Sequence, residues 1–307
     1  MTSIKFLTAL AAFVVACVAQ PIVRHTESDR WPEPVIRTDA NLVLVPVTVT
    51  DDRGAIVPNL TTDNFVLKDE KARQAVISLS RENAPVSLGV VFDLSGSMGS
   101  KIVKARAAVH EFLKNLEPQD EMFLVTFADR PELRIGYTDD PAAVENGLLF
   151  AKPGGSTALY DAVALAMDQM RKAQNRRRVL FLVSDGGDNH SRLTERELRH
   201  RVEEEEVQIH AIGIHDSSDR MDEARGPWIL EDLAKMTGGQ HHMVSDLGEL
   251  PDLAAKMSTA LHEYYVLGYR PTPTGLSGTF RRITVQVVRG ASTSRVWVYA
   301  RRGYRMP

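Results

Sequence analysis

The hydrophobic pattern divides the chain into segments that predict different structures. Residues 20–40 are polar with several prolines, which indicates a linker or extended arm. From residue 41 to residue 84, short β-branched runs such as Leu42 to Thr50 alternate with turn signals, which is typical of short strands. The same pattern returns over residues 264–307, and each stretch is too short to form a stable sheet alone, so we expect the two to pack together in one small all-β unit. The further strands expected in this unit are Phe65–Lys68, Ala75–Ser80, Tyr264–Tyr269, Arg282–Val288 and Arg295–Ala300.

Between residues 85 and 263 apolar strands alternate with amphipathic helices. The runs Ser87 to Phe92 and Val179 to Val183 are apolar without alternation, as in strands that are buried on both faces. Repeated strand–helix units predict a doubly wound, mostly parallel six-stranded sheet with helices on both faces. Glu121–Ala128 and Leu133–Tyr137 are joined by so short a loop that we expect an antiparallel hairpin at one edge. The predicted fold class is therefore α/β, with this sheet inserted in, or flanked by, the small all-β unit.

Residues 1–19 have the features of an export signal. The apolar run Phe6 to Val18 is shorter than the roughly 20 residues that cross a bilayer. We expect cleavage after Ala19, because Cys17 and Ala19 form a small-x-small site, which would give a periplasmic or secreted protein. Val14-Val15-Ala16-Cys17 also resembles a bacterial lipobox, and lipidation of Cys17 would instead anchor the protein to a membrane.

Composition and charge narrow the possible functions. Hydrophobic residues make up 43% and charged residues 25% of the chain, which is typical of a soluble globular protein. The net charge of −3 argues against nucleic-acid binding, which requires a concentrated basic excess. The only basic run, Arg176-Arg177-Arg178, is interpreted as a solvated helix end or strand entry. Cys17 is the only cysteine, so a chain cleaved after Ala19 would have no disulfide.

Oxygen-bearing side chains follow the predicted strands at three places. Asp93, Ser95 and Ser97 alternate in a glycine-containing loop after a buried strand, Thr157 precedes a helix, and Asp185 follows another buried strand. Ligand sites in open α/β sheets lie beyond the carboxyl ends of the strands, so we expect the three loops to converge. Oxygen ligands without Cys or His suit a hard cation, Mg²⁺ or Mn²⁺. The alternative is that Asp93, Ser95 and Ser97 only cap the following helix.

These residues match the metal-ion-dependent adhesion site of the von Willebrand factor A fold, whose pattern is Asp-x-Ser-x-Ser, then a Thr, then an Asp. The chain as a whole resembles a family of exported von Willebrand factor A-related proteins that is abundant in Acidobacteria, so residues 85–263 would form the von Willebrand factor A domain. The matching segments are Val47-Thr48-Val49-Thr50-Asp51, Asp63-Asn64-Phe65, Thr157-Ala158-Leu159-Tyr160-Asp161-Ala162, Ser184-Asp185-Gly186-Gly187-Asp188-Asn189, Thr237-Gly238-Gly239, Tyr265-Val266-Leu267-Gly268-Tyr269 and Ala300-Arg301-Arg302-Gly303-Tyr304.

The resemblance implies a role for each of the five residues. Ser95 and Ser97 would be direct ligands of the ion, and Asp93 would act through water. Thr157 and Asp185 would exchange direct and water-mediated roles with conformation. An acidic side chain of a partner protein would then complete the coordination of the ion, so the resemblance implies metal-bridged protein recognition.

Two other functions are compatible with the sequence. One is a structural β-sandwich scaffold with an unused metal site, and the other is a metal-dependent hydrolase. The chain has no Gly-x-Ser-x-Gly elbow, His-Glu-x-x-His or Walker-type loop. Its histidines are scattered, and alternation along a strand sends His241 and His242 to opposite faces. We therefore expect protein binding rather than catalysis.

Overall fold

The computed structural model describes residues 42–306 apart from residue 186 and residues 215–225, 272–277 and 289–294. The expected export signal, lipobox and linker therefore lie outside the described residues. None of the described helices is long and apolar enough to cross a membrane.

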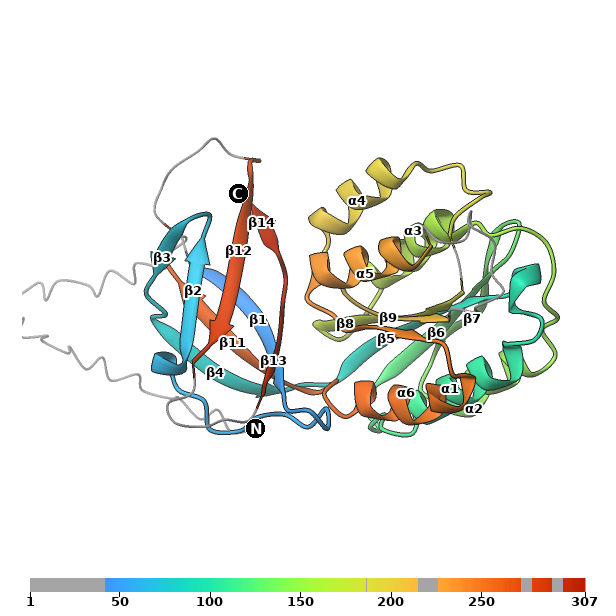
Figure 1. Cartoon of the computed structure of the whole chain (residues 1–307), viewed down its shortest axis with the longest axis horizontal. Helices are drawn as coiled ribbons and strands as arrows, with labels where there is room; N and C mark the ends of the chain where they lie inside the picture. Colours follow the sequence, from blue (N-terminus) through green and yellow to red (C-terminus); the bar gives the residue numbers. More distant parts are fainter. Residues whose placement is uncertain (1–41, 186, 215–225, 272–277, 289–294, 307) are drawn as a thin grey trace, which may run out of the picture. The chain divides into compact units, whose positions relative to one another are not determined.

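A mixed six-stranded sheet forms the centre of the α/β part of the chain (Figure 1). Its strand order is β10-β9-β8-β5-β6-β7. All neighbouring strands are parallel except β7, which pairs antiparallel with β6 and forms the expected edge hairpin. This architecture confirms the predicted fold class. The strands are β5 (Val86–Asp93), β6 (Glu121–Phe127), β7 (Pro131–Thr138), β8 (Arg177–Ser184), β9 (Gln208–Ile214) and β10 (His241–Val244).

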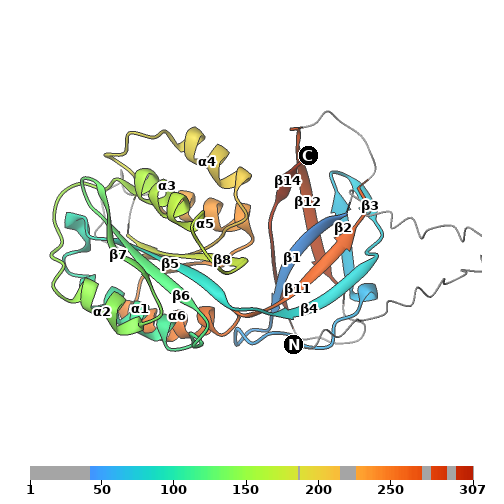
Figure 2. The same cartoon turned by 180° about the vertical axis from the view of Figure 1, so that it is seen from behind.

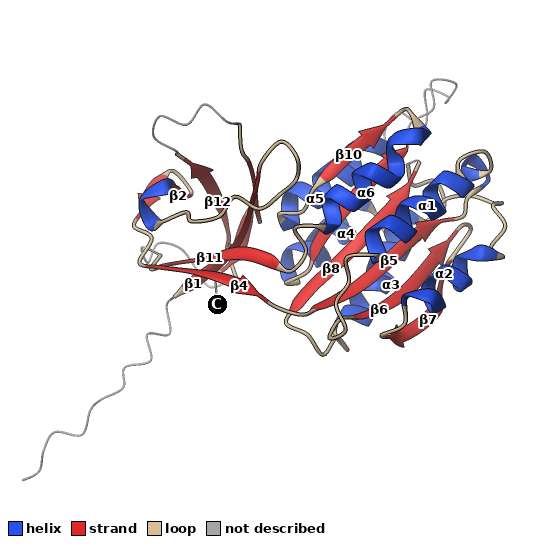
Figure 3. Ribbon diagram, turned by 90° about the horizontal axis from the view of Figure 1, so that it is seen from below, coloured by secondary structure: helices blue, strands red, loops and turns tan. Residues whose placement is uncertain are grey.

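Helices cover both faces of this sheet (Figure 3). Residues of α1 (Ile102–Leu113), α2 (Pro141–Leu149) and α6 (Leu250–Ser258) share one hydrophobic cluster with one face. Residues of α3 (Leu159–Met170) and α4 (Glu195–Glu204) share a second cluster with the other face, together with residues of α5 (Gly226–Thr237). Because both faces are covered, all eight residues of β5 are buried, which explains why its sequence shows no alternation.

Local signals explain where several helices begin. Asp140 accepts a hydrogen bond from the Ala142 N–H and is followed by Pro141, so α2 starts with a side-chain cap and a proline in its first turn. Thr194 and Glu197 form a capping box at the start of α4. These are signals that the sequence carries within a few residues, which is why the starts of these helices were predictable.

The β part of the chain contains two antiparallel sheets (Figure 2). The orders are β13-β1-β11-β4 and β14-β12-β2-β3. Strands from both ends of the chain pair with each other in both sheets, as expected, and the chain leaves this part after β4 and returns to it at β11. Their shared core includes Val47, Leu67, Tyr265 and Ile283. The strands are β1 (Val43–Thr50), β2 (Phe65–Asp69), β3 (Ala72–Gln74), β4 (Ser78–Asn83), β11 (Glu263–Tyr269), β12 (Phe280–Val287), β13 (Trp297–Ala300) and β14 (Gly303–Arg305).

Two details of the predicted structure were wrong. Only Ser78–Ser80 of the expected strand Ala75–Ser80 lies in a strand, because residues 75–77 connect β3 to β4, which is exposed at most positions and has a weak hydrophobic signal. The three-residue strand β14 was not predicted.

The interpretation of the basic run Arg176-Arg177-Arg178, at the start of β8, was only partly correct. Arg177 does enter the strand, but it is buried rather than solvated, with 7% of its surface exposed. Its guanidinium donates to Gln208 Oε1 at 2.6 Å and to the Leu261 carbonyl at 3.3 Å, and it lies over the ring of Tyr264. These partners are distant in sequence, so the basic run itself gives no sign of them.

Candidate metal centre

The structure brings the three predicted loops to the carboxyl edge of the central sheet. Asp93 is the last residue of β5, and Asp185 directly follows the neighbouring parallel strand β8. The loop after β5 is joined to the loop before α3 by two backbone hydrogen bonds, from the Gly154 N–H to the Leu94 carbonyl (2.8 Å) and from the Gly96 N–H to the Gly155 carbonyl (3.0 Å). The loops after β5 and β8 lie close together because parallel strands end at the same edge of the sheet. The two backbone bonds hold the loop before α3 beside the loop after β5.

Four of the five predicted side chains lie in one hydrogen-bonded cluster. The hydroxyl oxygens of Ser95 and Ser97 are 3.1 Å apart, and the Ser97 hydroxyl donates to Asp185 Oδ1 at 2.9 Å. Asp93 Oδ1 accepts the Ser95 N–H at 2.7 Å, and Asp93 Oδ2 accepts the Ser184 hydroxyl at 2.6 Å. The Ser95–Ser97 and Ser97–Asp185 contacts join side chains that the sequence had assigned to one site, whereas Asp93 is held by the Ser95 backbone and by Ser184, which the sequence had not assigned.

Thr157 is positioned through the backbone of its loop. Its N–H donates to Asn189 Oδ1 at 2.8 Å, and its carbonyl accepts the N–H groups of Asn189 and His190. The preceding residue, Ser156, donates its N–H to Asp129 Oδ1 at 2.7 Å. Sequence reasoning did not assign this role to Asn189. Its position four residues after Asp185, in the same loop, was the available signal.

The neighbouring carboxylate Asp188 has a structural role. Its oxygens accept the Tyr160 N–H at 3.2 Å and the N–H and hydroxyl of Ser191. These bonds stabilise the turn after β8 and the start of α3, so Asp188 serves as a turn residue.

Burial differs sharply among the five predicted residues. Asp93, Ser95, Thr157 and Asp185 are all at most 6% exposed. Ser97 is exposed. The cluster is therefore a buried set of oxygen atoms that opens to solvent at Ser97, and a ligand could reach it there.

The two carboxylates impose an electrostatic cost on the fold. Burial, and then the negative charge of Asp185, raises the pKa of Asp93 to about 6. Lys101 balances part of this charge, since its Nζ lies 2.8 Å from Asp185 Oδ2 and both side chains are almost fully buried. Sequence reasoning missed Lys101. A cation at the start of a helix is unfavourable for the helix dipole, and this departure was the available signal.

The helix-capping alternative does not describe these residues. The N-cap of α1 is Lys101, and its side chain makes no capping hydrogen bond. Ser95 precedes the 3-10 turn Gly96–Met98, also without a side-chain cap. The hydroxyls of Ser95 and Ser97 are directed at each other and at Asp185 instead.

The donor chemistry of the cluster is that of a hard-cation site. Two carboxylates and three hydroxyls lie on the three joined loops, and such oxygen donors are the ligands that Mg²⁺ and Mn²⁺ accept. In the described part of the chain no group of three or more His, Cys, Asp or Glu side chains could bind a metal ion. A site for a softer metal with several nitrogen or sulfur ligands is therefore not found among these residues.

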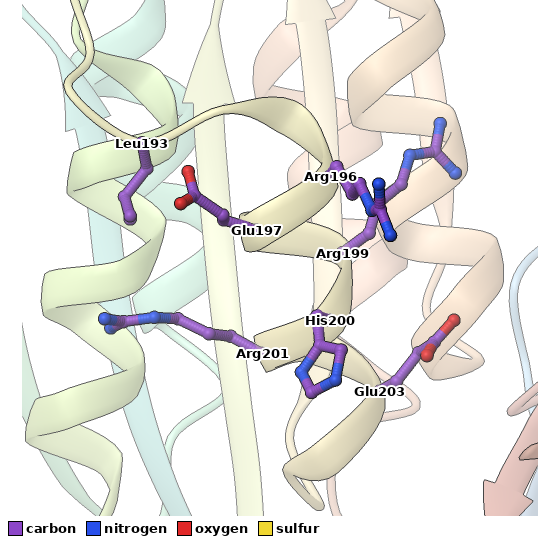
Figure 4. A pocket seen from close by; sticks show the side chains of 7 residues that line it. All are labelled: Leu193, Arg196, Glu197, Arg199, His200, Arg201 and Glu203. Carbon is purple, nitrogen blue, oxygen red and sulfur yellow. The ribbon is translucent and has the colours of Figure 1, made fainter. Parts of the chain in front are cut away.

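A pocket lies along α4, and most of the side chains that line it are charged (Figure 4). Several of its charges are already paired, as in the salt bridges of Arg199 with Glu195 and Asp232 and of Glu203 with Arg305. It shares no residue with the candidate metal centre, so we assign it no part in the proposed function. Its lining residues are Leu193, Arg196, Glu197, Arg199, His200, Arg201 and Glu203.

A comparison with protein families supports the class of the α/β part. Residues 88–187 match the family model described as von Willebrand factor type A domain. The matched segment runs from β5 to the loop after β8 and includes all five predicted site residues. The comparison with curated proteins gave no match.

Solved structures with detectable similarity share little sequence with the chain. A von Willebrand factor type A protein from Catenulispora acidiphila is 14% identical, covering 85% of this chain and 74% of its own, with a TM-score of 0.49. The vWF domain of the type V pili tip protein Mfa5 from Porphyromonas gingivalis is 15% identical, covering 58% and 94%, with a TM-score of 0.44. The PilB minor pilin from Streptococcus sanguinis is 14% identical, covering 58% and 62%, with a TM-score of 0.45.

Proposed function

We propose that this protein is an exported protein-binding module in which a divalent cation, Mg²⁺ or Mn²⁺, links the chain to an acidic side chain of a partner protein. The observation that carries the proposal is the buried oxygen cluster at the carboxyl edge of the central sheet, with its two carboxylates and its opening at Ser97. The family match over residues 88–187 supports the same function, because it covers this cluster.

The contacts suggest which of the five residues would bind the ion directly and which would act through water. Ser95 and Ser97 would be direct ligands, since their hydroxyls lie 3.1 Å apart at the open side of the cluster. Asp93 already accepts two hydrogen bonds and would contribute its charge through water, while Thr157 and Asp185 would complete the set. When bound, the ion would supply an open coordination position for a carboxylate oxygen.

Binding rather than catalysis fits the side chains around the cluster. His241 and His242 lie on the edge strand β10, which β9 separates from β8, so neither is next to Asp185 in the sheet. Among the described residues, the side-chain bonds at the site join serines, aspartates and Lys101, and the Lys101 ammonium pairs with Asp185. The two aspartates, which are the possible general bases in this set, already accept hydrogen bonds from the protein.

The test of this function is calorimetric titration of the full chain with Mg²⁺ and Mn²⁺ at pH 8. We expect one ion to bind per chain, and the double variant Asp93→Ala, Ser95→Ala to lose that binding. Asp139→Asn is the matched control, because it removes an exposed carboxylate away from the cluster. If the folded parent chain binds neither ion, the metal-bridged mechanism is wrong and the structural scaffold becomes the better interpretation.

Export is the second part of the proposal, and its basis is the sequence of residues 1–19. Mass spectrometry of the chain recovered from a bacterial host should show a mature protein that begins at Gln20. A mature protein that begins with a lipidated Cys17 would instead establish a membrane anchor, and Cys17→Ala would then release the protein. Recovery of only the uncleaved chain from the cytoplasm would contradict export.

A further inference from the structure

A pocket lined mainly by charged side chains lies at the carboxyl edge of the central sheet, outside the five predicted site residues. Its volume of about 590 Å³ is enough for an acidic side chain and the backbone that carries it. The loop after β6, the start of α3 and the loop after β8 contribute the residues of this pocket, which we call the arginine pocket: Asp129, Arg130, Pro131, Asp161, His190 and Arg192.

Hydrogen bonds connect the arginine pocket to the loop that carries Thr157. The Ser156 N–H donates to Asp129 Oδ1 at 2.7 Å, and the His190 N–H donates to the Thr157 carbonyl at 3.2 Å. Gly155 has a φ of +82°, and a Cβ there would lie 2.8 Å from both carboxylate oxygens of Asp129, so this side chain packs closely against the loop. Since Ser156 and Thr157 are neighbours, the arginine pocket adjoins the candidate metal centre, and one partner segment can contact both.

The carboxylates of the pocket are bound to backbone N–H groups. Asp161 Oδ2 accepts the Arg192 N–H and Oδ1 accepts the Leu193 N–H, both at 3.0 Å, while Asp129 accepts from Ser156. The hydrogen bonds of Ser156 also lower the pKa of Asp129, which keeps this carboxyl ionised. Both acids are therefore held in place without an arginine side chain.

The two arginines of the pocket are available to a ligand. Arg130 and Arg192 are exposed, and within the described part of the chain neither guanidinium donates a hydrogen bond or forms a salt bridge. Arg199, by contrast, is paired with Glu195 and Asp232. A guanidinium presents five N–H donors in a planar fork that matches a carboxylate. The pocket thus offers unused donors to an acidic group from outside.

The carboxylates restrict which acidic ligand can bind. Asp129 is exposed and Asp161 half-buried, so a polymer with a high density of negative charge would be repelled by both. A protein segment can supply an acidic side chain for the arginines and backbone N–H donors for the remaining lone pairs of the carboxylates. The arginine pocket therefore fits an acidic protein segment better than a polyanion.

We propose that the arginine pocket binds a second acidic side chain of the partner protein, close in sequence to the acidic side chain that meets the divalent ion. The inference rests on the proposed function, since it names the kind of partner that the same site takes. Once the first carboxylate is at the ion, the second contact is intramolecular, so the two contacts reinforce each other. The partner is then recognised by a pair of acidic residues rather than by one.

The experiment measures the binding of blocked peptides to the full chain by calorimetry at pH 8, with saturating Mg²⁺ and about 0.15 M sodium chloride to screen distant charges. One peptide carries a single aspartate among glycines. Two others carry two aspartates, two or four positions apart, which is about 7 or 13 Å in an extended segment. The better of these double peptides should bind the parent about tenfold more tightly than the single one, of which about twofold is statistical.

Two double variants separate the pocket from general charge attraction. Arg130→Gln, Arg192→Gln should reduce the gain of the double peptide to about twofold, while Mg²⁺ affinity stays within about threefold of the parent. Lys172→Gln, Arg176→Gln is the matched control. It removes two exposed cations that precede β8, at the opposite end of this eight-residue strand, and should keep the tenfold gain. All four side chains are exposed, so both variants should unfold at the same urea concentration as the parent.

The outcomes distinguish this inference from the proposed function. A gain of only twofold in the parent, or a tenfold gain that persists in Arg130→Gln, Arg192→Gln, would overturn the inference and leave the metal-bridged function standing. Tighter binding of a trimer of galacturonate than of the double peptides would show that an acidic polysaccharide is the ligand and would also overturn it. Absence of Mg²⁺ binding, or of peptide binding to the Mg²⁺-loaded chain, would overturn the proposed function and the inference with it.

Discussion

The chain buries charged groups in two regions, and the regions differ in how the charge is balanced. In the β part, Asp69 Oδ1 accepts from Arg281 at 2.8 Å, and Oδ2 accepts the hydroxyls of Tyr269 at 3.0 Å and Tyr304 at 3.3 Å. Asp69 is fully buried with Arg281 5% exposed, so one carboxylate and one guanidinium neutralise each other inside a closed core. All of its partners come from the other end of the chain, so this cluster stabilises the pairing of the two ends.

The candidate metal centre has a different balance. Among the described residues it contains two carboxylates, Asp93 and Asp185, beside the ammonium of Lys101, and it is open at Ser97. Burial of charge alone therefore does not indicate a ligand site, because the Asp69 cluster is equally buried. The opening at Ser97 distinguishes the candidate metal centre, since a ligand that binds there would lower the free energy of the folded state. The following predictions test this difference.

The largest expected effect comes from removing Asp69. Asp69→Ala leaves the Arg281 guanidinium buried without its carboxylate, which should lower the free energy of unfolding by about 3–5 kcal/mol. Urea denaturation of the parent and the variant measures this loss. Mg²⁺ affinity of the folded variant should stay unchanged. A loss below about 1 kcal/mol would show that the cluster is not balanced in the way we describe.

Removing a carboxylate from the candidate metal centre should raise the free energy of unfolding instead of lowering it. A carboxyl whose pKa is raised in the folded state destabilises that state increasingly as pH rises from its unfolded value to its folded value, here from 3.8 to about 6. In EDTA, Asp93→Asn should therefore gain stability relative to the parent between about pH 4 and pH 6, reaching about 3 kcal/mol at pH 7. Urea denaturation at a series of pH values measures the difference. A variant that is less stable than the parent at pH 7 in EDTA would contradict the raised pKa of Asp93.

Divalent ions should stabilise only the open cluster. At a Mg²⁺ concentration of 100 times the dissociation constant, the parent should gain about 2.7 kcal/mol of stability, because the ion binds the folded state. Asp93→Ala, Ser95→Ala should gain nothing, and Asp139→Asn should gain as much as the parent. Thermal unfolding with and without Mg²⁺ gives both values, and an equal gain in the double variant would place the ion elsewhere.

The smallest expected effect concerns the pair of His262 and Asp120, whose charges cancel only when His262 is protonated. His262 Nε2 lies 2.7 Å from Asp120 Oδ2. Burial lowers the pKa of His262, but the hydrogen bond and the charge of Asp120 outweigh burial, and the net pKa is raised. The pair therefore stabilises the fold fully below the unfolded pKa of about 6.5 and loses this contribution as pH rises through the folded pKa. His262→Gln should be less stable than the parent by roughly 1 kcal/mol more at pH 5.5 than at pH 9, as measured by urea denaturation, and a difference that grows with rising pH would contradict this sign.

Much of the fold was predictable because its signals are local. Hydrophobic runs such as Val179 to Val183 specify buried strands, and caps such as Thr194 with Glu197 specify where a helix begins. The β part was less predictable. The strand β4 has mostly exposed positions, and β14 has three residues, so pairing with distant strands decides both.

The sequence by itself determined the fold class and the five candidate site residues, because parallel strands bring the loops that follow them to one edge. Only the tertiary structure decided how the buried charges are balanced. Asp69 meets Arg281 across 212 positions, and Lys101 meets Asp185 across 84 positions. Such pairings depend on side chains that fold together from distant segments, and no local pattern of residues encodes them.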